Sequence, residues 1–206
     1  GKILADFLDE GVQLWREGDR LCYRSPEYIP SIRLRDRLAA QKPALLGLIR
    51  PGCRYAVPSP AQQRMWFLDR LMPDLPIYNS PEISLRLRGP LDSTVLRQSL
   101  EAIVRRHEPL RTLFTAFDGR PAQVILDSAE VDWEEEDLRH VAAARREEAA
   151  RRRLEEEVRR PFDLQRERPM RARLLRIGDE DHLLALVFHH VAVDGNRIEN
   201  PVHRGE

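Results

Sequence analysis

The alternation of apolar and polar residues predicts a β-hairpin near the C-terminal end of the chain. Residues 170–177 alternate in polarity, residues 178–181 carry a turn signal, and residues 183–188 form an unbroken apolar run. Such a run is typical of a strand that is buried on both faces. His189 and His190 follow it directly. Because side chains alternate along a strand, we expect the two histidines to point to opposite faces, so that only one can face any given cavity.

The first 50 residues have a pattern of short helices around a second hairpin. Residues 3–8 have helical spacing, and residues 12–24 alternate in polarity around a turn at Glu17-Gly18-Asp19. Ser31 is suited to cap a helix over residues 32–41, and Pro43 is suited to open a final helix. We expect a recognition module, because this unit is too small for an enzyme site and carries no candidate nucleophile or base.

The rest of the chain predicts a mixture of helices and strands after a linker. Proline and glycine mark residues 51–58 as the linker, and Ser59 caps a helix with Met65, Trp66, Leu68 and Leu71 on its buried face. We also predict a half-buried strand with Leu85 inward, a helix after Asp92 with Leu100, Ile103 and Val104 inward, a strand over 124–126, an acidic loop and helix start over 130–137, and a helix over 138–158.

Composition and charge exclude several classes of function. The chain has 34 basic and 34 acidic residues, so its formal net charge is zero, which argues against nucleic acid or an anionic membrane as partner. The arginines of residues 138–158 are interleaved with glutamates, which is typical of a solvated helix face. No apolar run is long enough to span a bilayer, and no secretory signal is visible. Cys22 and Cys53 fit two reduced thiols of a cytoplasmic protein.

The candidate chemistry lies in the stretch from His189 to Gly195. A metal site is disfavoured, because adjacent histidines face opposite ways and no further ligands stand at a suitable spacing. A neutral imidazole is well suited to take a proton from an amine or hydroxyl near neutral pH. Asp194 and Gly195 indicate a tight turn that can bring a carboxylate back to the strand end. The alternative is a structural pair of histidines that is satisfied by hydrogen bonds.

Three motifs in order resemble those of condensation domains from nonribosomal peptide synthetases, which have the chloramphenicol-acetyltransferase-like fold. Residues 59–67 resemble the opening motif S-x-A-Q-x-R-[LM]-W-F, residues 106–114 resemble R-H-E-x-L-R-T-x-F, and residues 189–195 resemble H-H-x-x-x-D-G. The resemblance implies an α+β protein whose second unit is an α/β sandwich lobe, with a mixed sheet and flanking helices. Two such lobes form a V around a tunnel that carrier-bound aminoacyl thioesters enter from opposite ends.

The same resemblance implies roles for individual residues. His190 would position or deprotonate the acceptor amine, His189 and Asp194 would shape the loop, and the Gly195 amide would face the developing oxyanion. Structural salt-bridge candidates are Arg106 and Arg111, either of which could pair with Asp194, and Arg64. No metal or bound cofactor is implied, because phosphopantetheine is supplied by the partner carrier domains. The paired histidines favour amide formation over heterocyclisation.

Residues 11–23 resemble the N-terminal docking domains of the TubC type. The resemblance implies that the hairpin offers a strand edge to the C-terminal linear segment of an upstream synthetase subunit, with charged side chains choosing the partner. Arg16, Arg20 and Arg24 are the candidate interface residues, with a solvated surface arginine as the alternative for each.

The predicted organisation is a docking domain over 1–50, a linker over 51–58, an N-terminal condensation lobe over 59–195 and a polar tail over 196–206 without a family match. We expect a fragment of a longer protein, without condensation activity by itself, because a tunnel needs two walls. Two alternatives stay open: an adaptor whose attached lobe is vestigial, and an acyltransferase of the same fold that uses coenzyme A.

Overall fold

The computed structural model describes residues 1–27, 29, 31–72 and 78–193. The helices are α1 (Lys2–Asp9), α2 (Ser31–Leu48), α3 (Pro60–Leu71), α4 (Ser93–Arg106), η1 (Glu108–Arg111), η2 (Leu138–His140) and α5 (Ala143–Arg159). The strands are β1 (Gln13–Glu17), β2 (Arg20–Arg24), β3 (Cys53–Ala56), β4 (Asn79–Arg88), β5 (Thr112–Phe117), β6 (Arg120–Leu126), β7 (Asp132–Asp137), β8 (Met170–Gly178) and β9 (Asp181–His189).

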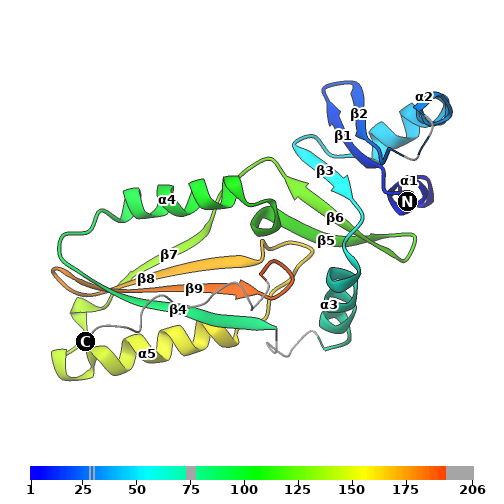
Figure 1. Cartoon of the computed structure of the whole chain (residues 1–206). Coiled ribbons are helices and arrows are strands. Elements are labelled where there is room, and N and C mark those ends of the chain that lie inside the picture. Colours follow the sequence, from blue (N-terminus) through cyan, green and yellow to red (C-terminus); the bar gives the residue numbers. More distant parts are fainter. Residues whose placement is uncertain (28, 30, 73–77, 194–206) are drawn as a thin grey trace, which may run out of the picture.

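The strands form two sheets that lie end to end in an elongated molecule (Figure 1). One sheet has the order β2-β1-β3-β6-β5 and is antiparallel throughout. The other has the order β4-β9-β8-β7, in which the β7–β8 pair is parallel. The predicted hairpins appear as β1–β2 and β8–β9, and the predicted mixed sheet with flanking helices is confirmed.

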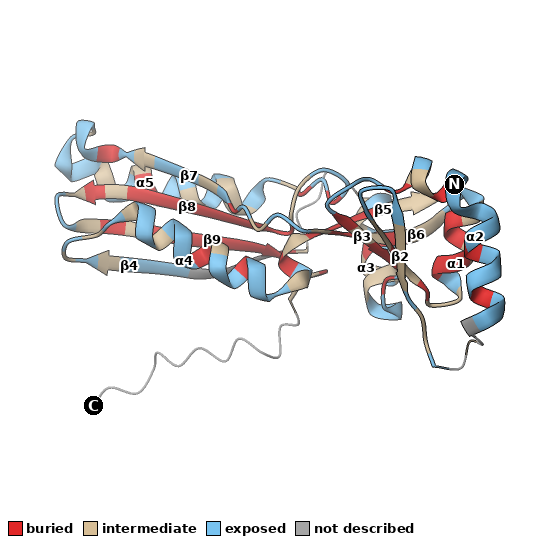
Figure 2. Cartoon of the chain, turned by 90° about the horizontal axis from the view of Figure 1, so that it is seen from above, coloured by how far each residue is buried: buried red, intermediate tan, exposed pale blue. Residues whose placement is uncertain are grey.

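Helices cover both faces of the four-stranded sheet, which explains why β8 and β9 are buried on both sides (Figure 2). Leu174 and Leu184 share one core cluster with Leu100 of α4. On the opposite face, Leu175 packs with Ala150 of α5. The two capped helices begin as predicted: the Ser59 side chain accepts from the Gln62 amide within a capping box, and the Asp92 carboxylate caps α4.

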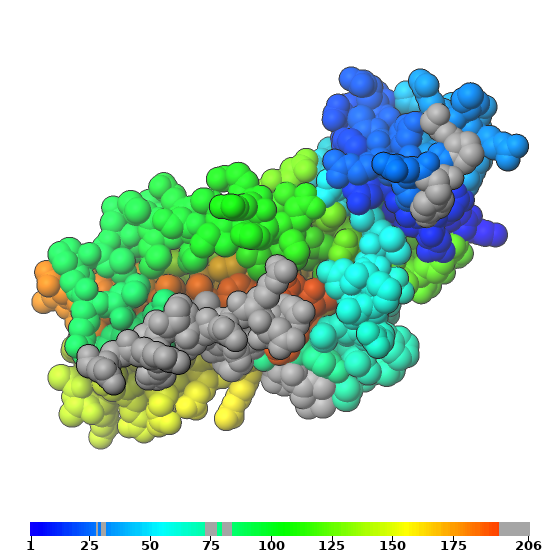
Figure 3. Space-filling model, in the orientation of Figure 1, coloured from blue at the N-terminus to red at the C-terminus, as the bar shows by residue number. Residues whose placement is uncertain are grey.

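The first unit and the second are joined by a shared sheet and a shared core. Residues 51–58 were predicted as a linker, but they contain β3, which pairs with β1 on one side and β6 on the other. The core beneath includes residues from both units: Leu4, Phe7, Leu8, Val12, Leu14, Leu34, Leu38, Leu45, Ile49, Cys53, Tyr55, Leu113, Ala122 and Val124. Figure 3 shows the first unit, in blue, packed directly against the rest of the molecule. A boundary at 51–58 therefore divides a sheet rather than two separate bodies.

The two helices predicted over residues 32–49 are one continuous helix, α2, with Pro43 inside it. A proline in a helix interior removes one backbone hydrogen bond and disfavours the helix. Here the buried stripe runs past it, because Leu38 and Leu45 are two turns apart and both pack in the shared core, whereas Pro43 is exposed. The burial of that apolar stripe outweighs the tendency of Pro43 to break the helix.

The structure contradicts further predictions, one on an acidic segment and others on apolar side chains that were expected to face inward. The acidic residues 132–137 were predicted as a loop and helix start but form β7, the edge strand beside β8. On the helices, Leu71 is 60% exposed and Ile103 47% exposed, although both were predicted to face inward. Leu85 is also exposed, on β4, which is the last of the described strands at one side of its sheet.

Candidate functional site

The two histidines at the end of β9 occupy different environments, as the strand alternation predicts. His189 is 1% exposed and lies on the same face as Val187, with Phe162 edge-on to its ring at 5.9 Å. Its Nε2 lies 3.2 Å from Asp69 Oδ1 on α3, and its Nδ1 accepts a hydrogen bond from the Val191 amide at 3.1 Å. Both ring nitrogens are therefore engaged within the protein.

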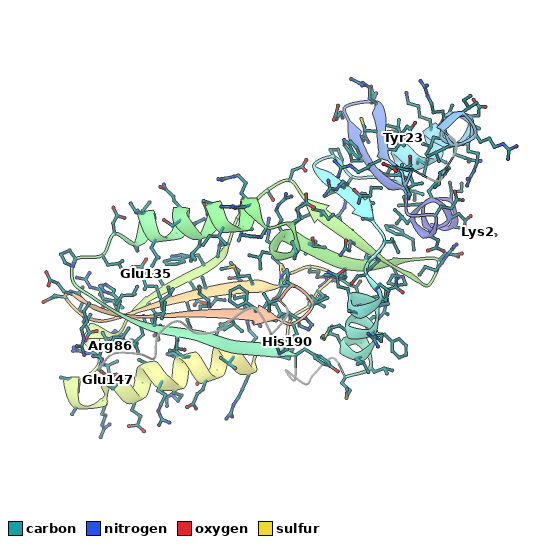
Figure 4. The ribbon with its side chains drawn as sticks, in the orientation of Figure 1. Lys2, Tyr23, Arg86, Glu135, Glu147 and His190 are labelled. Carbon is teal, nitrogen blue, oxygen red and sulfur yellow. The ribbon has the colours of Figure 1, made fainter. Side chains whose placement is uncertain are left out.

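His190 lies beyond the last residue of β9 and is only half-buried (Figure 4). Its backbone amide donates to the Tyr78 carbonyl at 2.9 Å, which fixes the main chain at this point. Within the described part of the chain, its imidazole makes no hydrogen bond or ion pair. Of the two histidines, His190 is thus the one whose ring nitrogens are not engaged by the described residues.

The predicted salt bridge joins Asp194 to Arg106 or Arg111. Asp194 and Gly195 lie outside the described residues, so only the arginines can be placed. Arg111, in η1, donates to the Leu126 carbonyl on β6 and lies 3.7 Å from Glu108. Arg106 at the end of α4 and Arg64 on α3 are exposed. These three arginines remain predictions.

A group of buried charges lies on the α5 side of the same sheet, and sequence reasoning missed it. Arg171 is completely buried, with its guanidinium 3.7 Å from the Phe162 ring centre and 3.1 Å from Glu157. Arg173 shares that carboxylate at 2.9 Å and also pairs with Asp132 at 3.0 Å. Burial lowers the pKa of Arg171 to about 10. The alternation of residues 170–177 predicts that both arginines lie on one face of the strand, and this pattern could have indicated the group of charges.

The predicted docking residues differ in how freely they are presented. Arg16 is tied to its own surroundings, because it donates to the Gly18 and Leu46 carbonyls at 2.9 and 3.2 Å. Arg20 and Arg24 are exposed on β2, the edge strand of the five-stranded sheet. A hollow of about 310 Å³ lies between β2 and α2 and is lined by Arg20, Leu21, Tyr23, Arg35, Leu38, Ala39 and Lys42.

Two further hollows do not have His190 among their lining residues. One of about 390 Å³ lies beside Asp69 and Phe162, and one of about 650 Å³ lies between α5 and β4. Over residues 1–27, 29, 31–72 and 78–193, no three His, Cys, Asp or Glu side chains are grouped so as to hold a metal ion. The helices in those ranges include none that is long and apolar enough to cross a membrane.

Comparison with known proteins identifies both units. The model of the TubC N-terminal docking domain matches residues 1–50, and that of the condensation domain matches residues 54–197. Phosphinothricin tripeptide synthetase of Streptomyces viridochromogenes is 46% identical over 66% of this chain and 12% of its own length. Isonitrile lipopeptide synthase of Mycobacterium tuberculosis is 41% identical over 79% of this chain and 6% of its own length.

A solved structure gives the same assignment for the fold. The first condensation domain of the calcium-dependent antibiotic synthetase, in complex with a substrate analogue, is 27% identical with a TM-score of 0.58. The match covers 67% of this chain and 33% of that domain, so the chain spans about a third of the solved domain and a small part of the curated synthetases. The resemblance stated from the motifs is confirmed: this chain belongs to the condensation-domain family and carries a TubC N-terminal docking domain ahead of the condensation segment.

Proposed function

We propose that this chain receives an upstream synthetase subunit through its docking unit and supplies His190 to peptide-bond formation between carrier-bound thioesters. The observation that carries the proposal is the division between the histidines. His189 is buried with both nitrogens engaged, whereas the half-buried His190 keeps its ring unbonded within the described residues. The relatives with condensation segments are peptide and lipopeptide synthetases, which supports the reaction class.

The chemistry requires a group beside the acceptor amine. The amine nitrogen attacks the thioester carbonyl carbon, the C–N bond forms, the C–S bond breaks, and the phosphopantetheine thiolate of the donor carrier leaves. The amine loses one proton, and the leaving thiolate gains one. A neutral imidazole at His190 can accept the first as a base or orient the amine through a hydrogen bond, and general-base catalysis contributes roughly 10²- to 10⁴-fold in rate. Asp194 would hold the loop and the Gly195 amide would face the oxyanion.

Catalysis also needs the second wall of the tunnel. The chain matches a third of the solved condensation domain, so we expect no peptide-bond formation by these 206 residues alone. Measurable dipeptide formation from loaded carriers by the purified chain would contradict this expectation.

The docking partner fits a short extended segment with carboxylates. Among the described strands, β2 is paired with β1 alone, so the backbone groups on its outer edge can accept an added strand. Arg20, Arg35 and Lys42 surround the adjoining hollow, and Leu21 and Tyr23 give it an apolar floor. The strand edge and the hollow together fit an acidic linear peptide with one or two apolar side chains.

Docking can be tested with a set of fluorescein-labelled acidic peptides, taken from the C-termini of synthetase subunits, by fluorescence anisotropy. We expect Arg20→Glu to weaken binding at least tenfold and Arg16→Gln, the matched control tied into the hairpin turn, to change it less than threefold. Equal binding by Arg20→Glu and the unaltered chain would contradict the proposed surface.

Catalysis can be tested after fusion of the chain to the second lobe of a related condensation domain. With loaded donor and acceptor carriers, we expect His190→Ala to lower the rate of dipeptide formation roughly 10²- to 10⁴-fold without changing peptide docking. Full activity of His190→Ala would favour a different catalytic group. A fusion that docks but never condenses would favour the adaptor, and acyl transfer from free acyl-coenzyme A would favour the coenzyme A-dependent alternative.

A further inference from the structure

Helix α3 holds the turn that carries His190 from two points. Asp69 Oδ1 lies 3.2 Å from His189 Nε2, and Gln62 Nε2 donates to the Val191 carbonyl at 3.4 Å. The two α3 residues are seven positions apart, which places them on one face of the helix, two turns from each other. They contact the residues immediately before and after His190.

The hydrogen bonds at His189 set its tautomer. The Val191 amide donates to Nδ1 at 3.1 Å, so Nδ1 presents a lone pair, and the proton of a neutral ring must be on Nε2. From there it points at the Asp69 carboxylate. The ring is also flanked by Phe162 at 5.9 Å and Tyr78 at 6.0 Å. Asp69 thus selects the one tautomer that can bind the Val191 amide.

The second contact is oriented by its own network. Gln62 Oε1 accepts from the Ser59 amide at 3.0 Å and from Gln123 Nε2 at 2.7 Å. With the oxygen occupied in this way, the Gln62 amide nitrogen faces the Val191 carbonyl. A further bond, from the Ala192 amide to the His189 carbonyl at 3.0 Å, closes the turn.

We propose that Asp69 is a positioning residue that acts through His189, and that Gln62 is its counterpart at Val191. Together they fix both neighbours of His190, so the direction of its side chain is set before substrate arrives. This inference rests on the proposed function for its consequence in catalysis, but the hydrogen-bond geometry can be tested without activity.

The test on the whole chain is two-bond ¹H–¹⁵N NMR of the histidine rings, with His189→Gln used to assign the signal. We expect His189 in the Nε2–H tautomer and a slowly exchanging Val191 amide. Asp69→Ser, whose hydroxyl is too short to reach the ring, should mix the tautomers and speed Val191 exchange at least tenfold, and Asp69→Asn, which keeps an acceptor oxygen, should largely restore both. Unchanged tautomer and exchange in Asp69→Ser would overturn the proposal.

A kinetic readout in the second-lobe fusion separates this proposal from the proposed function. We expect Asp69→Ser to lower kcat at least tenfold with KM for the acceptor carrier within threefold, and Gln62→Ala to act in the same direction. Gln63→Ala is the matched control, because Gln63 donates to the Pro58 carbonyl instead. If the NMR result holds while His190→Ala stays active, the positioning contact stands and the catalytic role of His190 fails. Unaltered kcat in Asp69→Ser, with His190→Ala inactive, would refute the positioning role alone.

Discussion

Leu14→Ala tests whether the docking unit and the condensation segment share one core. Leu14 lies on β1, is 0% exposed, and is paired in register with Tyr55 of β3. It belongs to the core cluster that also contains Val124 of β6. The substitution is made in the docking unit, but it should also destabilise strands of the condensation segment.

The expected magnitude follows from burial. Leu14→Ala removes three buried carbons, at roughly 0.8 kcal/mol each, and leaves a cavity in a site with core on every side. The total is about 3 kcal/mol, within the ~2–5 kcal/mol range of buried leucine truncations. For a chain of this size, that lowers Tm by about 6–12 °C.

Native-state hydrogen exchange and thermal unfolding provide the assay. In Leu14→Ala we expect faster exchange at the amides of β6 as well as those of β1, and a single shifted unfolding transition. Leu174→Ala is the control, because Leu174 is equally buried in the other sheet and its loss should expose β8 and β9 first. Two separate transitions, with β6 protection unchanged in Leu14→Ala, would refute the shared core.

Two other predictions concern charge. Arg171→Met should lose less stability in urea unfolding than Glu157→Leu, because it removes the desolvation cost of a buried arginine while Glu157 keeps Arg173 as a partner at 2.9 Å. Glu157→Leu should lose about 3–5 kcal/mol, because it leaves two buried arginines without that carboxylate. A larger loss in Arg171→Met than in Glu157→Leu would contradict this order. The two hydrogen bonds from Arg37 lower the pKa of Glu10 in the folded protein below its ordinary value of 4.5. The ion pair therefore stabilises the fold at pH values above 4.5, and this stabilisation is lost as the pH falls through the lowered pKa of the folded protein. Glu10→Gln should therefore cost up to ~1 kcal/mol at pH 7, because both side chains are partly exposed, and nothing at the acid end; a cost that grows on acidification would contradict the assignment.

The parts of the site that were predictable from sequence are those governed by local rules. Strand alternation placed His189 and His190 in different environments, and side-chain capping fixed the start of α3 at Ser59. Asp69 was not predicted, because an acidic residue on a helix carries no local sign of its partner 120 positions away. The signal that could have found it is that a histidine buried at a strand end needs acceptors or donors for both nitrogens.

The errors in the fold have the same origin. The residues of β3 alternate in polarity, but the surrounding prolines and glycine favoured a linker, and only pairing with β1 and β6 makes the strand. The acidic β7 has little strand propensity and is held by its pairing with β8 and by basic partners such as Arg173. Pairing with a strand that is distant in the sequence cannot be predicted from the ten or so residues around a position.

The joined sheet also bears on docking. A strand added at the edge of β2 would extend the same sheet that includes β3, β6 and β5. Gln123 lies on β6 and donates to Gln62, which in turn holds the Val191 carbonyl. The docking edge and the turn of His190 are thus attached to one continuous framework.

The role of His190 is tested most directly by the single-turnover rate of peptide-bond formation by the second-lobe fusion, measured by rapid quench with both carriers loaded. We expect His190→Ala to lower this rate roughly 10²- to 10⁴-fold while the affinity for both carriers and for the docking peptide is unchanged. A His190→Ala rate within threefold of the unaltered fusion would contradict the assignment of His190 to the acceptor amine.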